Sequence, residues 1–206
     1  AEAEDFSAVA DLMAVIDAVV GDAPAILVGC SMGGRIAIDA ALRHSSRIRA
    51  LVLITPGVSG APDPVYPPRI GELMAEQRAA VEAGALERIN AIAARLWLDG
   101  PLADEGRIQG PVRELFLDMN GIALRSPPFG TNRDAEPAFQ RLHEIAVPTL
   151  VIQGNLDFPH IQERSRHAAA AMPHAVHREL PGAAHLPSLE QPAQIAGAIT
   201  EFVSRA

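Results

Sequence analysis

Residues 25–34 read AILVGCSMGG, an apolar run followed by a glycine-rich turn. The first four residues are apolar, which predicts a short strand buried on both faces, and a helical pattern follows it to about His44. Between the two, Gly29, Ser31 and Gly33 form a Gly-x-Ser-x-Gly pattern. A serine on so tight a turn needs glycine neighbours, because side chains there would collide with the strand or the helix. The stretch therefore predicts an exposed serine hydroxyl at a helix N-terminus, where backbone N–H groups favour negative charge. The plainer interpretation is a glycine-rich turn that only joins two elements.

Apolar runs and helical patterns alternate along the rest of the chain. The apolar runs predict strands over residues 25–28, 48–54 and 148–152, and a weaker pattern predicts a fourth strand over 176–180. Helical spacing predicts helices over residues 6–20, 32–44, 162–171 and 191–203. Strands that alternate with helices favour a parallel sheet with helices on both faces. We therefore expect an α/β fold with a mostly parallel sheet and flanking helices.

Residues 61–142 differ from the segments on either side. They begin with a proline-rich run, continue with helical patterns, and contain five of the eight aromatic residues of the chain. No strand pattern interrupts them. We expect a helical cap over residues 61–142, inserted into a core made of residues 1–60 and 143–206.

Two residues could activate the serine. A serine becomes a nucleophile when a base takes its proton, and the base needs a carboxylate to orient it. Asp157 follows the third predicted strand, and His185 lies in the loop between the last strand and the last helix. Since sites form at the carboxyl edge of open parallel sheets, we expect Ser31, Asp157 and His185 to meet there. The plainer interpretations are a turn residue for Asp157 and an ordinary loop histidine for His185. His160 is the second candidate base, but it shares a loop with Asp157 and lies too close in sequence to turn toward Ser31.

The composition excludes several classes of protein. A chain of 206 residues, 49% of them hydrophobic, can form a globular core, unlike a disordered chain. A net charge of −8 repels phosphate backbones, so we expect no nucleic acid partner. No apolar run reaches the roughly 18 residues that a membrane span needs, so no membrane interaction is expected. The acidic first residues lack the features of a secretory signal, which favours a cytoplasmic location.

Other polar residues receive plainer interpretations. Cys30 is the single cysteine, so an internal disulfide is excluded, and we interpret it as a small buried residue. His174 and His177 have no third ligand at metal spacing, so no metal is expected. No nucleotide-binding glycine pattern occurs, and we expect no cofactor. Glu190 is interpreted as a complement to the N-terminus of the last helix.

Several motifs together resemble those of the α/β-hydrolase superfamily over most of the chain. They are GCSMGG at residues 29–34, GNLD at 154–157 and PGAAHLP at 181–187. The SMGGRIA run at 31–37 and the WLDGP run at 97–101 are similar to those of small bacterial esterases and 3-oxoadipate enol-lactonase-like hydrolases. The resemblance implies a hydrolase core with a helical cap over its pocket.

The resemblance also implies a role for each site residue. Ser31 would be the nucleophile, His185 the general base and acid, and Asp157 the carboxylate that orients the histidine. The backbone N–H of Met32 would be one donor to the oxyanion that forms during the reaction. No metal or cofactor takes part in this chemistry.

One departure from the family concerns the start of the chain. Members of the superfamily have several strands before the serine turn, and a loop there supplies the second oxyanion donor. Here a single predicted helix precedes Ala25. We therefore expect a core that lacks its N-terminal strands, with an open edge on the strand that leads to Ser31. Loss of one oxyanion donor typically costs about 10²- to 10³-fold in rate. An N-terminal partner fragment or a homo-oligomer could cover the edge.

The expected function is hydrolysis of a small-molecule carboxylic ester or lactone through an acyl-enzyme. The predicted cap is aromatic and aliphatic, which suggests a mainly apolar substrate and a pocket formed by Tyr66, Trp97, Met119 and Phe129. Packing between cap and sheet explains the same residues equally well. Two alternatives stay open. The same triad can hydrolyse a carbon–carbon bond in a β-diketone-like substrate, and a catalytically impaired fragment could act as a binding or interaction module.

Overall fold

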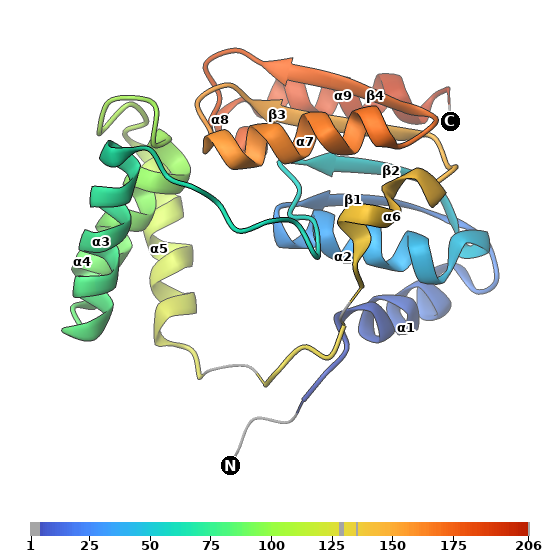
Figure 1. The fold of residues 1–206 in the computed structure, drawn as a ribbon, viewed down its shortest axis with the longest axis horizontal. Helices are drawn as coiled ribbons and strands as arrows, with labels where there is room; N and C mark the ends of the chain where they lie inside the picture. Colours follow the sequence, from blue (N-terminus) through green and yellow to red (C-terminus); the bar gives the residue numbers. More distant parts are fainter. Residues whose placement is uncertain (1–4, 128–129, 135, 206) are drawn as a thin grey trace.

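A four-stranded parallel sheet forms the centre of the molecule, in the order β1-β2-β3-β4 (Figure 1). The computed structural model describes residues 5–127, 130–134 and 136–205. The strands are β1 (Ala25–Cys30), β2 (Ile48–Ile54), β3 (Thr149–Gly154) and β4 (Ala175–Leu180). Each pairs in parallel with its neighbour, and helices connect them. The predicted α/β fold with a parallel sheet is confirmed.

The helices fall into two groups along the chain. Those around the sheet are α1 (Ala8–Val20), α2 (Met32–Arg43), α6 (Ala138–Arg141), α7 (Pro159–Ala171), α8 (Pro187–Glu190) and α9 (Pro192–Val203), with the short 3-10 turns η1 (Ser45–Arg47) and η3 (Leu142–Glu144). Those of the middle segment are α3 (Pro68–Glu82), α4 (Leu86–Ala93), the π-helix η2 (Ala94–Asp99) and α5 (Pro111–Arg125). Five of the described helices begin with proline, namely α3, α5, α7, α8 and α9. The N–H that proline lacks is not needed there, because the first turn has no intrahelical acceptor for it. No described helix is long and apolar enough to cross a bilayer.

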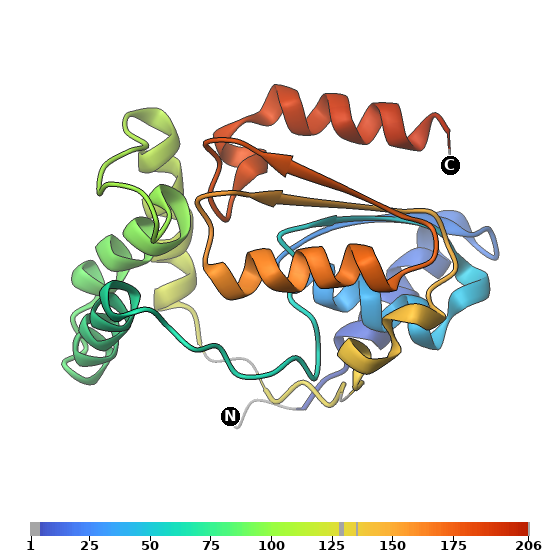
Figure 2. The same ribbon diagram turned by 45° about the horizontal axis from the view of Figure 1, so that its top comes forward.

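Helices cover both faces of the sheet (Figure 2). Helices α1, α2 and α7 lie on one face, and α9 lies on the other. Successive residues of β2 point to opposite faces, as the pleat of a strand requires. Leu51 and Leu53 therefore pack with α1 and α2, whereas Val52 and Ile54 pack with Ile195 of α9.

Helices α3, α4, η2 and α5, called the helical layer below, lie beyond the carboxyl ends of the strands (Figure 1). Buried residues of this layer, among them Ile70, Ile89 and Leu96, pack with Phe158 and Ile161 near the start of α7. The chain then returns to the sheet, where Ala138 and Leu142 join the core cluster of α1 and α2. The helical layer therefore faces the edge of the sheet at which β1, β2, β3 and β4 end.

Strand β1 forms one edge of the sheet. It pairs with β2, and no second described strand pairs with it. Val28 in the middle of β1 is 52% exposed, so the prediction of a strand buried on both faces is wrong for β1. The reason is its place at the edge, because a strand with one neighbour is covered less completely than one between two. The predicted open edge is confirmed within the part of the chain that the structure describes.

Candidate active site

Ser31 occupies a strained turn between β1 and α2. Its φ is +51°, a left-handed conformation that is uncommon for residues other than glycine. The turn is held by its backbone, since Ser31 N–H donates to the carbonyl of Ile54 at 2.9 Å and Ser31 C=O accepts from Gly57 at 3.0 Å. These bonds tie the serine to the end of β2 and fix its direction at the carboxyl edge.

The glycines of the turn have unequal roles. A Cβ on Gly29 would overlap the backbone of Gly33, and a Cβ on Gly34 would come within 2.9 Å of Pro56 Cβ. A Cβ on Gly33 would meet nothing within 4 Å. The expectation that both Gly29 and Gly33 leave necessary room is therefore correct for Gly29 and wrong for Gly33. The α-carbon of Gly29 lies against the backbone of Gly33. Of these two residues, only Gly29 must therefore lack a side chain.

The structure brings Ser31, His185 and Asp157 into one hydrogen-bonded chain. His185 Nε2 lies 2.9 Å from Ser31 Oγ, and His185 Nδ1 lies 2.8 Å from Asp157 Oδ2. A carboxylate only accepts, so Nδ1–H donates to Asp157 and Nε2 is left to accept the serine proton. Asp157 is fully buried and His185 is 5% exposed. This arrangement is the geometry that proton removal from a serine requires.

Two loops fix the carboxylate against the histidine. Leu156 N–H donates to the carbonyl of Ala183 at 2.9 Å, and Gly182 N–H donates to Asn155 Oδ1 at 2.8 Å. A Cβ on Gly154 would overlap the carbonyl of Ala183, so only glycine permits this approach. The GNLD and PGAAHLP motifs are thus joined by one backbone–backbone bond and by one bond to the Asn155 side chain.

Met32 is the first residue of α2, so its backbone N–H has no intrahelical acceptor and lies beside Ser31. The N-terminus of α2 carries a partial positive charge, which attracts an anion to the same place as this N–H does. Such a position can stabilise negative charge on an oxygen bound next to Ser31.

The predicted pocket residues lie in different surroundings. The ring of Trp97 packs 4.7 Å from the ring of His185 and 4.8 Å from that of Phe158, between centroids. Tyr66 lies 6.0 Å from Phe158. Met119 is 60% exposed on α5. Phe129 lies outside the described residues. The structure therefore gathers Tyr66 and Trp97 around Phe158, which follows Asp157 in the chain.

His160 lies near the triad and not in it. Its ring is 5.5 Å from that of Tyr66 and 5.4 Å from that of Phe158, and no hydrogen bond joins it to Ser31 within the described ranges. Burial lowers the pKa of His160 to about 4, with a further contribution from Arg164. It is therefore neutral near pH 7.

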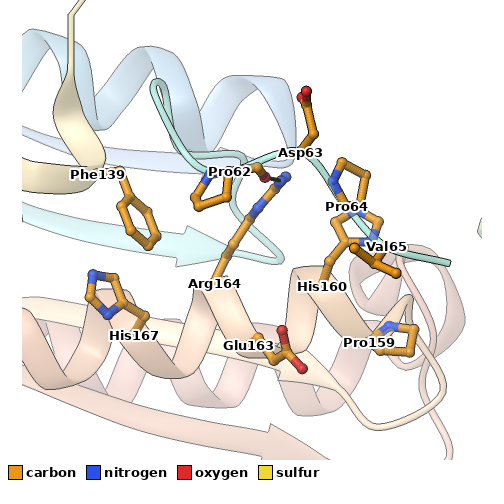
Figure 3. A pocket seen from close by; sticks show the side chains of 10 residues that line it. All are labelled: Pro62, Asp63, Pro64, Val65, Phe139, Pro159, His160, Glu163, Arg164 and His167. Carbon is orange, nitrogen blue, oxygen red and sulfur yellow. Dashed lines mark hydrogen bonds between the residues drawn. The ribbon is translucent and has the colours of Figure 1, made fainter.

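A cavity of about 370 Å³ opens beside His160 (Figure 3). The segment 62–65 and the first half of α7 form its walls, with Phe139 and His167 stacked at one end at 4.3 Å between ring centroids. Arg164 crosses it to the carbonyl of Pro62. Ser31 is not among its lining residues, so this cavity does not receive the reacting group.

Sequence reasoning missed several residues that hold the site. Thr55 is fully buried at a φ of +44°, and its hydroxyl lies 3.0 Å from the carbonyl of His185. In the sequence, Thr55-Pro56-Gly57 indicates that a strand ends there, and it contains no signal that Thr55 contacts His185. The interpretation of Glu190 is wrong, because its carboxylate accepts the N–H groups of Ala184 and Leu186. Its position five residues after His185 was the available signal, but the loop that brings it back to Ala184 does not appear as a periodic pattern.

A parallel sheet with a strained serine turn, and with a histidine and a carboxylate at the same edge, defines an α/β hydrolase. The model of the alpha/beta hydrolase family matches residues 1–198, and the chain belongs to this family. The resemblance noted in the sequence is confirmed, and the protein is a hydrolase.

Relatives of known sequence or structure agree with this assignment. The pimeloyl-(acyl-carrier protein) methyl ester esterase of Chromobacterium violaceum is 28% identical over an alignment of 220 positions, which covers 97% of this chain and 76% of the relative. The solved structure of Rv0554 from Mycobacterium tuberculosis is 25% identical with a TM-score of 0.71, covering 99% of this chain and 74% of that one. A thermophilic esterase from Thermogutta terrifontis is 26% identical with a TM-score of 0.68, covering 96% and 71%. The chain thus spans about three quarters of the length of each relative.

Proposed function

We propose that the protein hydrolyses a carboxylic ester, with Ser31 as nucleophile, His185 as base and Asp157 as the carboxylate that orients it. The observation that carries the proposal is the unbroken hydrogen-bonded chain between these three side chains, with distances of 2.9 and 2.8 Å. The names of two relatives support ester chemistry, since one is a methyl ester esterase and another a thermophilic esterase.

The reaction proceeds in two halves through an acyl-enzyme. In the first, Ser31 Oγ attacks the carbonyl carbon while its proton moves to His185 Nε2, and the carbonyl oxygen becomes an anion beside the N–H of Met32. The tetrahedral intermediate collapses, and the leaving alcohol takes the proton from His185. In the second, water gives a proton to His185 and attacks the acyl carbon, which releases the acid and returns the proton to Ser31. Asp157 keeps its charge throughout and stabilises the imidazolium.

We further propose that the helical layer acts as the cap, over residues 61–142, of a core formed by residues 1–60 and 143–206. Trp97 and Tyr66 from this segment, with Phe158 from the core, would form an aromatic wall beside the triad. Such a wall favours an ester or lactone whose acyl or ring part is apolar.

The test is the intact mass of the protein before and after reaction with a fluorophosphonate, followed by peptide mapping. We expect one adduct, located on Ser31, and no adduct in the variants Ser31→Ala and His185→Ala. The absence of an adduct on folded wild-type protein would overturn the proposal in favour of an interaction module, for which the exposed edge of β1 offers a surface.

A panel of p-nitrophenyl esters, lactones and β-diketones then defines the bond that is cleaved. We expect turnover of an ester or a lactone. Turnover of the β-diketone alone would contradict the ester proposal and assign carbon–carbon bond hydrolysis to the same triad.

A further inference from the structure

The carboxylate of Glu190 is bonded to both neighbours of His185. Ala184 N–H donates to Glu190 Oε2 at 2.9 Å, and Leu186 N–H donates to Oε1 at 3.1 Å. The Glu190 side chain is only 1% exposed, so water does not compete for these bonds. A shift of the loop around His185 would break one of the two bonds or both.

Arg107 is the cation that balances this buried carboxylate. Its Nη2 group pairs with Glu190 Oε2, and its side chain is 20% exposed. The guanidinium donates at 2.7 Å to each of three further backbone carbonyls, those of Leu98, Asp99 and Gly182. A planar group with several fixed donors can hold such a set of acceptors, which the single ammonium of a lysine cannot do.

The three carbonyls belong to two parts of the molecule. Gly182 lies at the start of the loop that carries His185, whereas Leu98 and Asp99 are the last residues of η2, the helix that carries Trp97. One arginine therefore joins the helical layer to the histidine loop, within a few residues of the contact between Trp97 and His185.

We propose that the pair Arg107–Glu190 is the positioning element that keeps His185 in line with Ser31 and that connects this alignment to the helical layer. The inference rests on the proposed function. Neither residue touches the reacting atoms, so both would act through the loop. Misplacement of a reacting group by about 1 Å can cost about 10²-fold in rate, so control of the loop position is sufficient for a large effect.

A second ion pair of the chain provides a matched control. Asp134 is 2% exposed, accepts Val9 N–H at 3.0 Å and pairs with Arg43 at 2.6 Å. It resembles Glu190 in burial and in having one arginine and a backbone partner. It links the start of α1 to α2, and none of its described contacts involves the triad.

The experiment compares Glu190→Gln, Arg107→Lys and Asp134→Asn with the wild type. Two quantities are measured on each folded protein: the rate constant for fluorophosphonate labelling, and hydrogen exchange at the amides of Ala184 and Leu186. We expect Glu190→Gln to lower the labelling rate about 10- to 100-fold and to accelerate exchange at both amides. Arg107→Lys should lower the labelling rate less, because lysine keeps the positive charge but lacks the planar set of donors.

The control separates positioning from general stability. Asp134→Asn should lower the melting temperature and leave the labelling rate of the folded protein at the wild-type value. With an ester substrate, the Glu190→Gln loss should appear in kcat, with KM changed less than twofold. Rescue of most of the rate by Glu190→Asp with restored exchange protection would also support positioning.

Several results would overturn the inference. Wild-type labelling and exchange in folded Glu190→Gln would do so, and so would an equal rate loss in Asp134→Asn. If Glu190→Gln does not fold, Arg107→Lys is measured in its place. A wild-type labelling rate in folded Arg107→Lys would then contradict the inference. A wild-type protein that never labels would contradict the proposed function, whereas the exchange data would still decide whether Glu190 holds the loop.

Discussion

The indole ring of Trp97 packs against the imidazole ring of His185, with centroids 4.7 Å apart and planes inclined by 53°. The two residues come from distant parts of the chain, Trp97 from η2 of the helical layer and His185 from the loop after β4. Trp97 also contacts Phe158, which directly follows Asp157. The helical layer thus contacts both His185 and Phe158 through one aromatic side chain.

Replacement of Trp97 by alanine is expected to lower kcat about tenfold. The proposed reaction converts His185 to a cation, and an aromatic face beside a cation contributes about 0.5–2 kcal/mol, where 1.4 kcal/mol corresponds to tenfold. Trp97→Phe keeps an aromatic face and should retain most of the rate. Steady-state kinetics with a p-nitrophenyl ester provide the measurement. A Trp97→Ala enzyme as fast as the wild type would show that this ring contact has no catalytic effect.

The variant Asp157→Asn is expected to fold and to lose about 10³- to 10⁴-fold in kcat/KM. An amide Nδ2 facing His185 would donate to Nδ1, which moves the ring proton to Nε2 and leaves no acceptor for the serine proton. Asp39→Asn is the control, because Asp39 is also buried, at 1% exposure, and bonds to Ser59 and not to the triad. We expect its kcat/KM to stay within threefold of the wild type. A similar loss of kcat/KM in both variants would contradict a specific role of Asp157 beside His185.

Alanine at Gly29 and at Gly33 should give opposite results. A Cβ on Gly29 would overlap the Gly33 backbone, so we expect Gly29→Ala to destabilise the protein by more than about 2 kcal/mol or to prevent folding. A Cβ on Gly33 meets nothing within 4 Å, and alanine favours a helix over glycine by about 1 kcal/mol. Gly33→Ala should therefore be neutral or stabilising. Urea unfolding curves measure both, and equal destabilisation would contradict the glycine contacts described above.

The stability of the protein should fall between about pH 6.5 and pH 4 partly because of His160. Burial lowers the pKa of His160 from 6.5 to about 4, so in this range the unfolded chain binds a proton that the folded chain does not. Stability from this residue is thus complete above about pH 6.5 and is lost as the pH falls. Because the ring is only half-buried, we expect a contribution of about 1–2 kcal/mol after allowing for solvent screening.

The variant His160→Phe tests this pH dependence. It keeps an aromatic ring next to Tyr66 and Phe158 and removes the titrating group. The free energy of unfolding is measured by urea at pH 4.5 and pH 7.5. We expect the difference between the two values to be smaller in the variant than in the wild type. An unchanged difference would assign the acid sensitivity to other groups.

Much of the fold was predictable because its signals are local. The apolar runs at 48–54 and 148–152 belong to central strands, which are buried on both faces and read as continuous hydrophobic segments. The residues Ser31, Asp157 and His185 each follow a strand, and parallel strands bring their carboxyl ends to one edge. Their positions after predicted strands were therefore enough to predict that they meet, and the structure brings them together.

Other features depended on contacts that no local pattern contains. Arg107 and Glu190 are separated by 83 residues, and the bond between them exists only because the helical layer folds over the histidine loop. The exposure of Val28 depends on how many strands β1 pairs with, which its own apolar sequence does not report.

Local sequence was sufficient to predict most strands and helices, the serine turn and the residues that could form a triad, because short-range sterics and hydrophobic periodicity act within a few residues. The groups that surround Ser31, His185 and Asp157 could be identified from the folded chain alone. Thr55 and Trp97 lie far from His185 in the chain and approach its backbone carbonyl and its ring. Glu190 binds the amides on either side of His185 because the loop between them folds back.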